Sequence, residues 1–310
     1  MGPWLSEVGF EVLYWLPFLA WVADRHGIEP GRLTAISRGG AGIWYGGLAG
    51  TYLDAFERWE PGDLKDAQHA RARSRRQSQK QLELMPDEHR LVDALLTAHE
   101  IDPRGTTLLH PSALYLAFRG FWEGWRTIGD VTGRTLNRPL PLPDADPGLG
   151  LPDDYVAVKI YFSDCFPDTP ANRSASAELL RRLSENGNVV LLTTGLDLDD
   201  HTEMSGVDQE RVFDISGAML PTTNLAVQTR AIAGARAFIG TYGGFSYLAP
   251  FLGVPAVSIY TEHNFIESHL DVMRHAVPAL RAARPRADFA VHALHEDIDL
   301  PTLAAAGAAS

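Results

Sequence analysis

Residues 237–260, AFIGTYGGFSYLAPFLGVPAVSIY, decide the fold that we predict for this chain. They begin as an apolar strand, pass through a glycine-rich turn at 240–244, and continue as a helix over 245–252. Gly253 and Pro255 end that helix before a second apolar strand. Strand, helix and strand in this order predict two parallel strands joined by a crossover helix.

The same alternation extends over the second half of the chain. Further β-rich runs occupy 155–162, 189–194 and 211–215, and helical stretches occupy 174–186 and 225–233. We therefore expect a parallel sheet with helices on both faces. Such a sheet binds ligands at the carboxyl ends of its strands, near the point where the strand order reverses.

The first half also has an α/β pattern, with a helix expected over 7–26 and a short strand over 33–37. Residues 139–153 are rich in proline, glycine and aspartate, which suit neither a helix nor a strand. The prediction is an α/β chain of two Rossmann-like domains, 1–140 and 154–303, with a linker at 141–153 and a disordered tail at 304–310.

Composition limits the classes of function. The net charge of −12 argues against a nucleic-acid partner. Cys165, the single cysteine, excludes an intramolecular disulfide and suits a reducing, cytoplasmic setting. The apolar stretch 8–23 contains Glu11 and Pro17 and is shorter than the roughly 20 residues of a spanning helix, so we predict a buried helix and no transmembrane segment. Peripheral contact with a membrane stays open.

The turn after the 237–239 strand is the strongest candidate for a ligand site. Its glycines let a ligand approach the backbone, and the N–H groups that open the next helix can receive a diphosphate. Thr241 and Ser246 add hydroxyl donors. The candidate donor-site residues here are Gly240, Thr241, Tyr242, Gly243, Gly244 and Ser246. A tight turn without a ligand is the structural alternative.

At residues 246–255, SYLAPFLGVP, the chain resembles the donor-site motif of bacterial GT-B glycosyltransferases, and the heptosyltransferase group most closely. A second match lies at the N-terminus, where that group has a serine/glycine loop, an acidic residue, an apolar stretch and a Leu-Pro step. The matching residues are Ser6, Gly9, Glu11, Val12, Leu13, Leu16 and Pro17. The resemblance implies a GT-B fold, whose two Rossmann-like domains have parallel sheets facing a cleft.

The resemblance also implies an activity. It implies an inverting, metal-independent transfer of a sugar from a nucleotide-diphosphate sugar to a hydroxyl of a glycan or small-molecule acceptor, with no cofactor. Glu11 would be the general base, and burial in its apolar stretch would raise its pKa toward a useful range. Glu7, one helical turn earlier, is the competing base. A purely structural carboxylate at a helix N-terminus is the alternative for Glu11.

Further donor-site candidates follow the other predicted strands. Similar GT-B enzymes place a basic residue against the donor phosphates at the end of the 155–162 strand, which implies that role for Lys159. The remaining candidates are Tyr161, Thr194, Gly195, Asn224 and Glu262. Asn224 can instead be a helix cap, Glu262 a surface carboxylate, and Lys159 a charge on a solvated strand face.

The first domain is expected to hold the acceptor. Arg38, Gly39 and His110 close probable strands and are the acceptor-side candidates, although a histidine beside a proline is often structural. The basic run 71–81, RARSRRQSQKQ, is interpreted as a solvated helix or mobile loop, or else as a lid or an acceptor contact. The aspartates at 197, 199 and 200 form a DxD-like pattern that we interpret as solvated, so no metal site is predicted.

Two other functions remain open from the sequence. A nucleotide-sugar epimerase would need the same diphosphate site but no acceptor. A non-catalytic protein that binds a sugar nucleotide or a glycan would bind its ligand without turnover.

Overall fold

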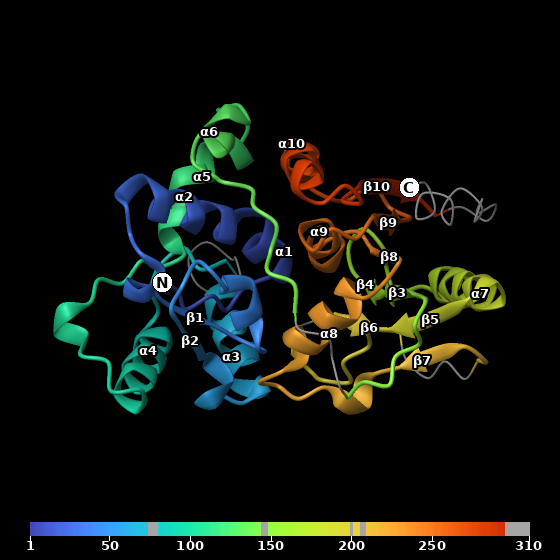
Figure 1. Ribbon diagram of the computed structural model, residues 1–310, viewed down its shortest axis with the longest axis horizontal. Coiled ribbons are helices and arrows are strands. Elements are labelled where there is room, and N and C mark those ends of the chain that lie inside the picture. The colour runs from blue at the N-terminus through green and yellow to red at the C-terminus, as the bar shows by residue number, and fades with distance from the viewer. Residues whose placement is uncertain (74–79, 144–147, 199–200, 205–208, 295–310) are drawn as a thin grey trace. The chain divides into compact units, whose positions relative to one another are not determined.

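The computed structural model describes residues 1–73, 80–143, 148–198, 201–204 and 209–294 (Figure 1). The chain forms two compact units. Unit 1 is Met1–Leu136 together with Leu196–Asp199 and Leu220–Ala226, and unit 2 is the remainder. The tail predicted at 304–310 and positions 144–147 of the predicted linker lie outside the described residues.

Unit 1 opens with a helical segment that matches the helix expected over 7–26. It consists of α1 (Val8–Phe10), a π-helical turn η1 (Glu11–Trp15) and α2 (Leu16–His26), which ends at Gly27 in the left-handed conformation. Pro17 accounts for the π turn, which the sequence did not predict. Proline has no N–H to donate to the Leu13 carbonyl, and its ring would clash with that carbonyl in a regular α-helix.

The parallel sheet of unit 1 has two strands within the described residues. β1 (Thr34–Ser37) confirms the predicted strand, and β2 (Thr51–Asp54) pairs with it so that Ser37 is level with Asp54. Residues 1–4 run beside β1, since Trp4 N–H donates to the Ile36 carbonyl (2.9 Å). The core on this sheet is formed by Leu5, Ile36, Leu53, Ala55, Leu64, Leu91, Val92 and Leu95.

The other helices of unit 1 follow the sheet. They are α3 (Pro61–Ala72), α4 (Pro86–Ala98), α5 (Ser112–Trp122) and α6 (Gly129–Thr132), with 3₁₀ turns at Pro30–Arg32, Ala41–Tyr45, Ala55–Glu57 and Pro103–Gly105. The prediction that 71–81 is a solvated helix or mobile loop is wrong at both ends, because Arg71 and Gln81 are buried. Positions 74–79 of that run are not among the described residues.

Unit 2 is built on a six-stranded parallel sheet (Figure 1). Its strands are β3 (Tyr155–Lys159), β5 (Asn188–Leu191), β7 (Val212–Asp214), β8 (Ala237–Thr241), β9 (Ala256–Tyr260) and β10 (Phe289–Ala293). Their order is β7-β5-β3-β8-β9-β10, so the chain builds outward from β3 in one direction and then returns to build outward from β8 in the other. This is the Rossmann order 3-2-1-4-5-6, with its switch point between β3 and β8. The predicted α/β fold with a parallel sheet is confirmed, and β10 is an addition.

One predicted strand is divided in two. The run expected to form a single strand over 155–162 breaks at Ile160, and β4 (Tyr161–Phe162) instead pairs antiparallel with β6 (Thr202–Glu203). Lys159 and Tyr161 therefore belong to different sheets.

The helices of unit 2 are α7 (Pro170–Asn186), α8 (Asn224–Ala233), α9 (Gly244–Phe251) and α10 (Glu267–Ala283), with a 3₁₀ turn at Ser216–Ala218. The predicted helices at 174–186, 225–233 and 245–252 are confirmed. Helix α9 packs against β8 and β9, which places its first turn at the carboxyl end of β8.

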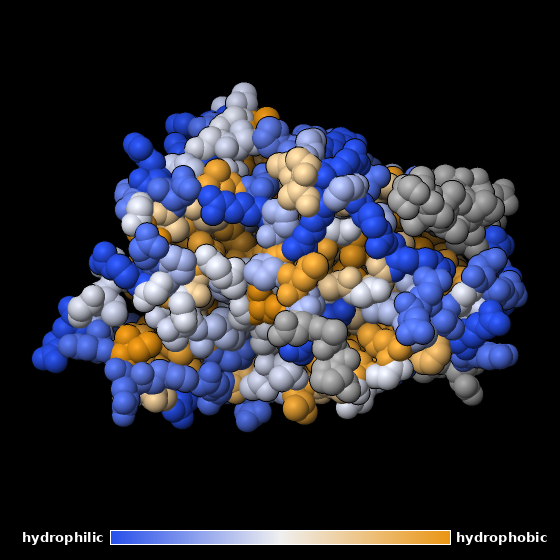
Figure 2. Space-filling model, viewed as in Figure 1, coloured by the Kyte–Doolittle hydropathy of each residue, from blue (hydrophilic) through white to orange (hydrophobic). Residues whose placement is uncertain are grey.

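In the described part of the chain, no helix combines the length and apolarity needed to cross a bilayer. Hydrophilic residues cover much of the face drawn in Figure 2, with apolar patches among them. The exposed large apolar side chains include Leu116, Trp125 and Leu220.

Candidate functional site

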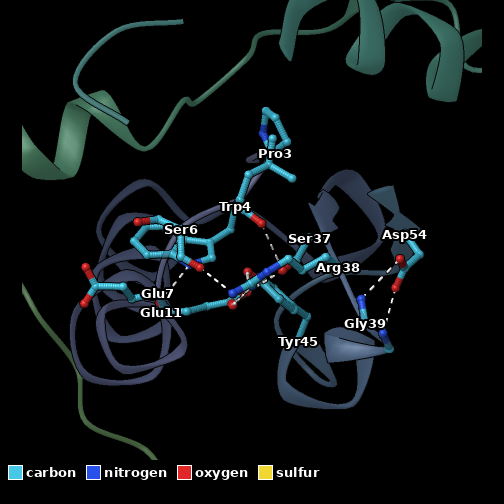
Figure 3. Close-up of polar contacts among 12 residues, drawn as sticks. Pro3, Trp4, Ser6, Glu7, Glu11, Ser37, Arg38, Gly39, Tyr45 and Asp54 are labelled. Atoms are coloured by element: carbon cyan, nitrogen blue, oxygen red, sulfur yellow. Dashed lines mark hydrogen bonds and ion pairs between the residues drawn. The ribbon is translucent and has the colours of Figure 1, made fainter. Parts of the chain in front are cut away.

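The Glu11 carboxylate lies at the carboxyl end of β1, completely buried (Figure 3). Ser37 Oγ donates a hydrogen bond of 2.6 Å to its Oε1, and the Tyr45 hydroxyl donates one of 2.7 Å to the same atom. Arg38 stands 3.4 Å from Oε2. The π turn begins at Glu11, so the backbone irregularity falls on the residue that the resemblance selects as the base.

Burial raises the pKa of Glu11 to about 7. The positive charge of Arg38 and the hydrogen bonds from Ser37 and Tyr45 oppose this rise, but they do not cancel it. A carboxyl group that exchanges its proton near neutral pH can accept a proton from a hydroxyl and later release it. Glu11 therefore has the proton affinity of a general base.

Glu7 has a different environment. It is the exposed N-cap of α1 with an extended backbone (ψ 140°) rather than a helical residue. In Figure 3 its carboxylate points away from Ser37 and Arg38. The two candidate bases therefore do not share one helix face, and only Glu11 lies in the cluster of polar groups around the end of β1.

The turn after β1 joins Glu11 to a second buried carboxylate, Asp54. Arg38 also donates to the Ser6 carbonyl, and the next two residues, Gly39 and Gly40, have φ values of 67° and 78°. Both glycine N–H groups donate to Asp54, at 3.2 and 2.7 Å. Asp54 was not predicted from the sequence. Its position at the end of β2, level with Ser37 at the end of β1, is the signal that would have identified it once the two strands were paired.

His110 lies in a separate buried network. His110 was predicted to close a strand, but the element before it is the 3₁₀ turn Pro103–Gly105, and it comes shortly before α5. Its Nδ1 accepts the Ser112 N–H (3.1 Å), which leaves Nε2 to donate to Glu88 (3.2 Å). Glu88 also pairs with Arg71 (2.7 Å) and accepts from Gln81 (3.1 Å). These contacts give His110 a structural role in the network around Glu88.

In unit 2 the predicted glycine turn lies at the switch point. Gly243 is the N-cap of α9, with φ 139°, and Gly244 is the first residue of that helix. A Cβ atom on Gly243 would lie 2.3 Å from the Tyr161 hydroxyl, which donates to the Tyr242 carbonyl (3.1 Å). Only glycine fits at position 243. The first N–H groups of α9 have no partner within the helix, so they are available as donors to an anion.

The two hydroxyls predicted as ligand donors are engaged within the turn. Thr241 Oγ1 donates to the Tyr161 carbonyl (2.8 Å), and Ser246 Oγ donates to the Thr241 carbonyl (2.9 Å). Gly240 lies in β8 against the Lys159 carbonyl, where a Cβ would come within 2.6 Å. These three residues shape the turn before α9.

Lys159, at the end of β3, is buried beside the first turn of α9. Its ammonium group is 4.8 Å from the ring centre of Phe245, 2.5 Å from Glu203 Oε1 and 2.9 Å from the Leu192 carbonyl. Burial disfavours the charged form of Glu203, but Lys159 and hydrogen bonds from Thr194 outweigh it and hold the Glu203 pKa below its usual range. Glu203 was also missed from the sequence, since only the folding of β6 against β4 brings it to Lys159.

Thr194 belongs to the same cluster. Its N–H and its hydroxyl donate to Glu203 Oε2 at 2.6 and 2.8 Å, and Gly195 follows in the left-handed conformation (φ 63°). The Lys159–Glu203 ion pair and the hydrogen bonds from Thr194 thus connect the end of β3, strand β6 and the segment that follows β5.

The last two donor-site candidates lie elsewhere. Asn224 is buried at the start of α8, in the part of that helix that belongs to unit 1, and its Nδ2 donates to the Pro221 carbonyl (2.8 Å). Glu262 is exposed just after β9, and its N–H donates to the Cys165 carbonyl (3.0 Å).

In the described ranges, no group of three or more His, Cys, Asp or Glu side chains is arranged to hold a metal ion. Asp197 of the DxD-like pattern accepts from Lys65 (2.7 Å) within unit 1. Asp199 and Asp200 lie outside the described residues.

Comparisons with known proteins give structural likeness only. No family model matches the chain, and no curated protein matches it. Among solved structures, the chain is similar to an ADP-heptose lipopolysaccharide heptosyltransferase II from E. coli, with 15% identity over 91% of this chain and 96% of that one and a TM-score of 0.45. It is also similar to the glycosyltransferase SnogD from Streptomyces nogalater, with 12% identity over 88% of this chain and 91% of that one and a TM-score of 0.34. A third similar structure is the iron-containing dodecameric glycosyltransferase TibC from enterotoxigenic E. coli H10407, with 12% identity over 91% of this chain and 74% of that one and a TM-score of 0.37. These three proteins are glycosyltransferases, and the first is a heptosyltransferase.

Proposed function

We propose that this chain is a glycosyltransferase that moves a sugar from a nucleotide-diphosphate sugar to an acceptor hydroxyl, with inversion and without a metal ion. The observation that carries the proposal is the glycine turn at the start of α9, placed at the switch point of a sheet with Rossmann strand order. Ligands of such sheets bind at this point, and a helix N-terminus there favours an anion.

The position of the turn selects a nucleoside diphosphate over a dinucleotide such as NAD. A dinucleotide site has its glycine fingerprint after the first strand of the sheet. Here the first strand is β3, and residues 160–169, IYFSDCFPDT, contain no glycine. The glycines follow β8, the fourth strand, and Lys159 at the end of β3, paired with Glu203, lies beside the first turn of α9.

For the chemical step we assign Glu11 as the general base toward the acceptor hydroxyl. Its pKa of about 7 lets it accept a proton at neutral pH, and the hydrogen bonds from Ser37 and Tyr45 fix its orientation. A base serves a transferase, which must activate an acceptor. Groups with strongly shifted pKa values cluster at active sites, so the raised pKa of Glu11 favours a transferase over a non-catalytic binding protein.

The donor site is tested by thermal unfolding of the chain with UDP, GDP, ADP and dTDP. One nucleoside diphosphate at 100 times its dissociation constant should stabilise the native state by about 2.7 kcal/mol. Gly244→Asp should abolish this stabilisation, because its carboxylate would repel the diphosphate at the helix N-terminus. The ligand-free protein should tolerate the change, because an acidic residue suits a helix N-terminus.

Gly244→Asn is the matched control, since it has the same size without the charge. It should keep more of the nucleotide response than Gly244→Asp. Equal responses of the two variants, or no stabilisation of the unsubstituted chain by any nucleoside diphosphate, would remove the proposed donor site.

A further inference from the structure

Asp54 is a buried carboxylate at the end of β2 that accepts four hydrogen bonds. Its Oδ1 accepts from the N–H groups of Gly39 (3.2 Å) and Phe56 (2.9 Å). Its Oδ2 accepts from the Gly40 N–H (2.7 Å) and the Tyr52 hydroxyl (2.8 Å). Burial raises the pKa of Asp54, and these four hydrogen bonds to its carboxylate oppose that rise.

Two of these bonds fix the turn that follows Arg38. Gly39 and Gly40 both have left-handed backbones, which direct their successive N–H groups toward the one carboxylate. The Gly39 carbonyl in turn accepts from Leu225 N–H (2.7 Å), also within unit 1. β1 holds the backbone before Arg38, and Asp54 holds the backbone after it.

Arg38 is thereby held with its guanidinium group between the Ser6 carbonyl and Glu11 Oε2 (Figure 3). We infer that Asp54 is a positioning residue, which acts through the Gly39–Gly40 turn to keep the Arg38 guanidinium against the Glu11 carboxylate. The catalytic meaning of this inference rests on the proposed function of Glu11, but the linkage between the two carboxylates does not.

A direct charge effect of Asp54 on Glu11 and an effect through Arg38 would have opposite signs. Acting only as a negative charge, Asp54 would raise the pKa of Glu11. By holding Arg38 in place, it lowers that pKa, because Arg38 is the largest influence that favours the ionised form. The other titratable groups facing Glu11 are Tyr45, which donates to it, and Tyr52, whose hydroxyl is held by Asp54.

The experiment is a carboxyl-carbon NMR titration of the whole chain labelled with ¹³C at glutamate, with the Glu11 signal identified by its loss in Glu11→Gln. In Asp54→Asn the amide group cannot accept from all four donors, so the turn loosens and Arg38 moves. The Glu11 pKa should then rise by about 1 or more, in line with the loss of an adjacent opposite charge. Arg38→Met should give a similar rise, and the double variant should give no more than Arg38→Met alone.

Tyr52→Phe is the control, because it removes one hydrogen bond from Asp54 and leaves both glycine N–H groups in place. It should leave the Glu11 pKa close to that of the unsubstituted chain. A Glu11 pKa that falls in Asp54→Asn would show that only the direct charge effect operates, and an additive double variant would show that Asp54 does not act through Arg38. Either result would overturn the inference.

A second measurement needs no substitution, in case Asp54→Asn does not fold. When the unsubstituted chain is acidified, the Gly39 and Gly40 amide signals and the Arg38 side-chain signal should move together with the Asp54 carboxyl carbon. Independent transitions would contradict the linkage. Neither measurement requires transferase activity, so an inactive chain with linked titrations would refute the proposed function and keep this inference.

Discussion

Between pH 4.5 and pH 8, the unsubstituted chain should lose about 3 kcal/mol of unfolding free energy relative to Glu11→Gln. The pKa of Glu11 rises from its ordinary value of 4.5 to about 7 in the folded chain, and each unit of difference is worth about 1.4 kcal/mol. The folded state binds this proton more tightly than the unfolded state. Its contribution to stability is therefore complete below pH 4.5 and is lost as the pH rises through about 7.

Urea unfolding of both proteins at pH 4.5, 6, 7 and 8 measures the effect. All other titratable groups are present in both chains, so the difference between the two curves isolates Glu11. The ion pair with Arg38 forms only when Glu11 is ionised, so its effect is already included in the Glu11 pKa of about 7. Parallel curves would mean that Glu11 titrates normally and lacks the proton affinity of a general base.

Arg71→Met should cost about 3–5 kcal/mol of unfolding free energy, because it leaves Glu88 as a charge buried without its cation. The Arg71 guanidinium is 2.7 Å from Glu88 Oε1 and also donates to the Leu5 carbonyl (3.0 Å). Glu88 is completely buried, and the pKa of its carboxyl group is held below the usual range, with hydrogen bonds and the charge of Arg71 outweighing the effect of burial.

The matched control is Arg181→Met in α7, which breaks ion pairs with Glu178, at the same 2.7 Å distance, and with Glu185, both on the exposed surface. This change should alter the urea midpoint little. In the double variant Arg71→Met/Glu88→Gln the buried charge is gone, so part of the loss should be recovered. Equal effects of the two Arg→Met changes would show that the Glu88 network is not a buried ion pair.

The fold of unit 2 was predictable because its signals are local. The apolar runs of β8 and β9 flank a glycine turn and a short helix, and each of these signals lies within about 25 residues of sequence. The predicted length of β3 was wrong: residues 155–162 are apolar apart from Lys159, so periodicity gave no reason for the break at Ile160. That break comes from the pairing of β4 with β6, a contact with residues 40 positions away.

The candidate site was predictable only where a residue stands in a motif. Glu11 and the 240–244 turn were identified in this way. Ser37, Tyr45 and Asp54 were missed, since each reaches its role through the pairing of β1 with β2 and the folding of Ala41–Tyr45. Tertiary contacts also decided the environment of predicted residues. Lys159 pairs with Glu203, and His110 pairs with Glu88. In both pairs the two residues lie far apart in the sequence.

The central claim is that Glu11 is the base of a sugar transfer from a nucleotide sugar. The most direct measurement is product formation by the unsubstituted chain and by Glu11→Gln. Each is incubated with hydroxyl acceptors and nucleotide sugars carrying the diphosphate that stabilises the chain. We predict transfer by the unsubstituted chain, and a loss of at least about 100-fold in Glu11→Gln with nucleotide binding unchanged, since a general base contributes about 10²–10⁴ in rate. Transfer by Glu11→Gln at the unsubstituted rate would contradict the account.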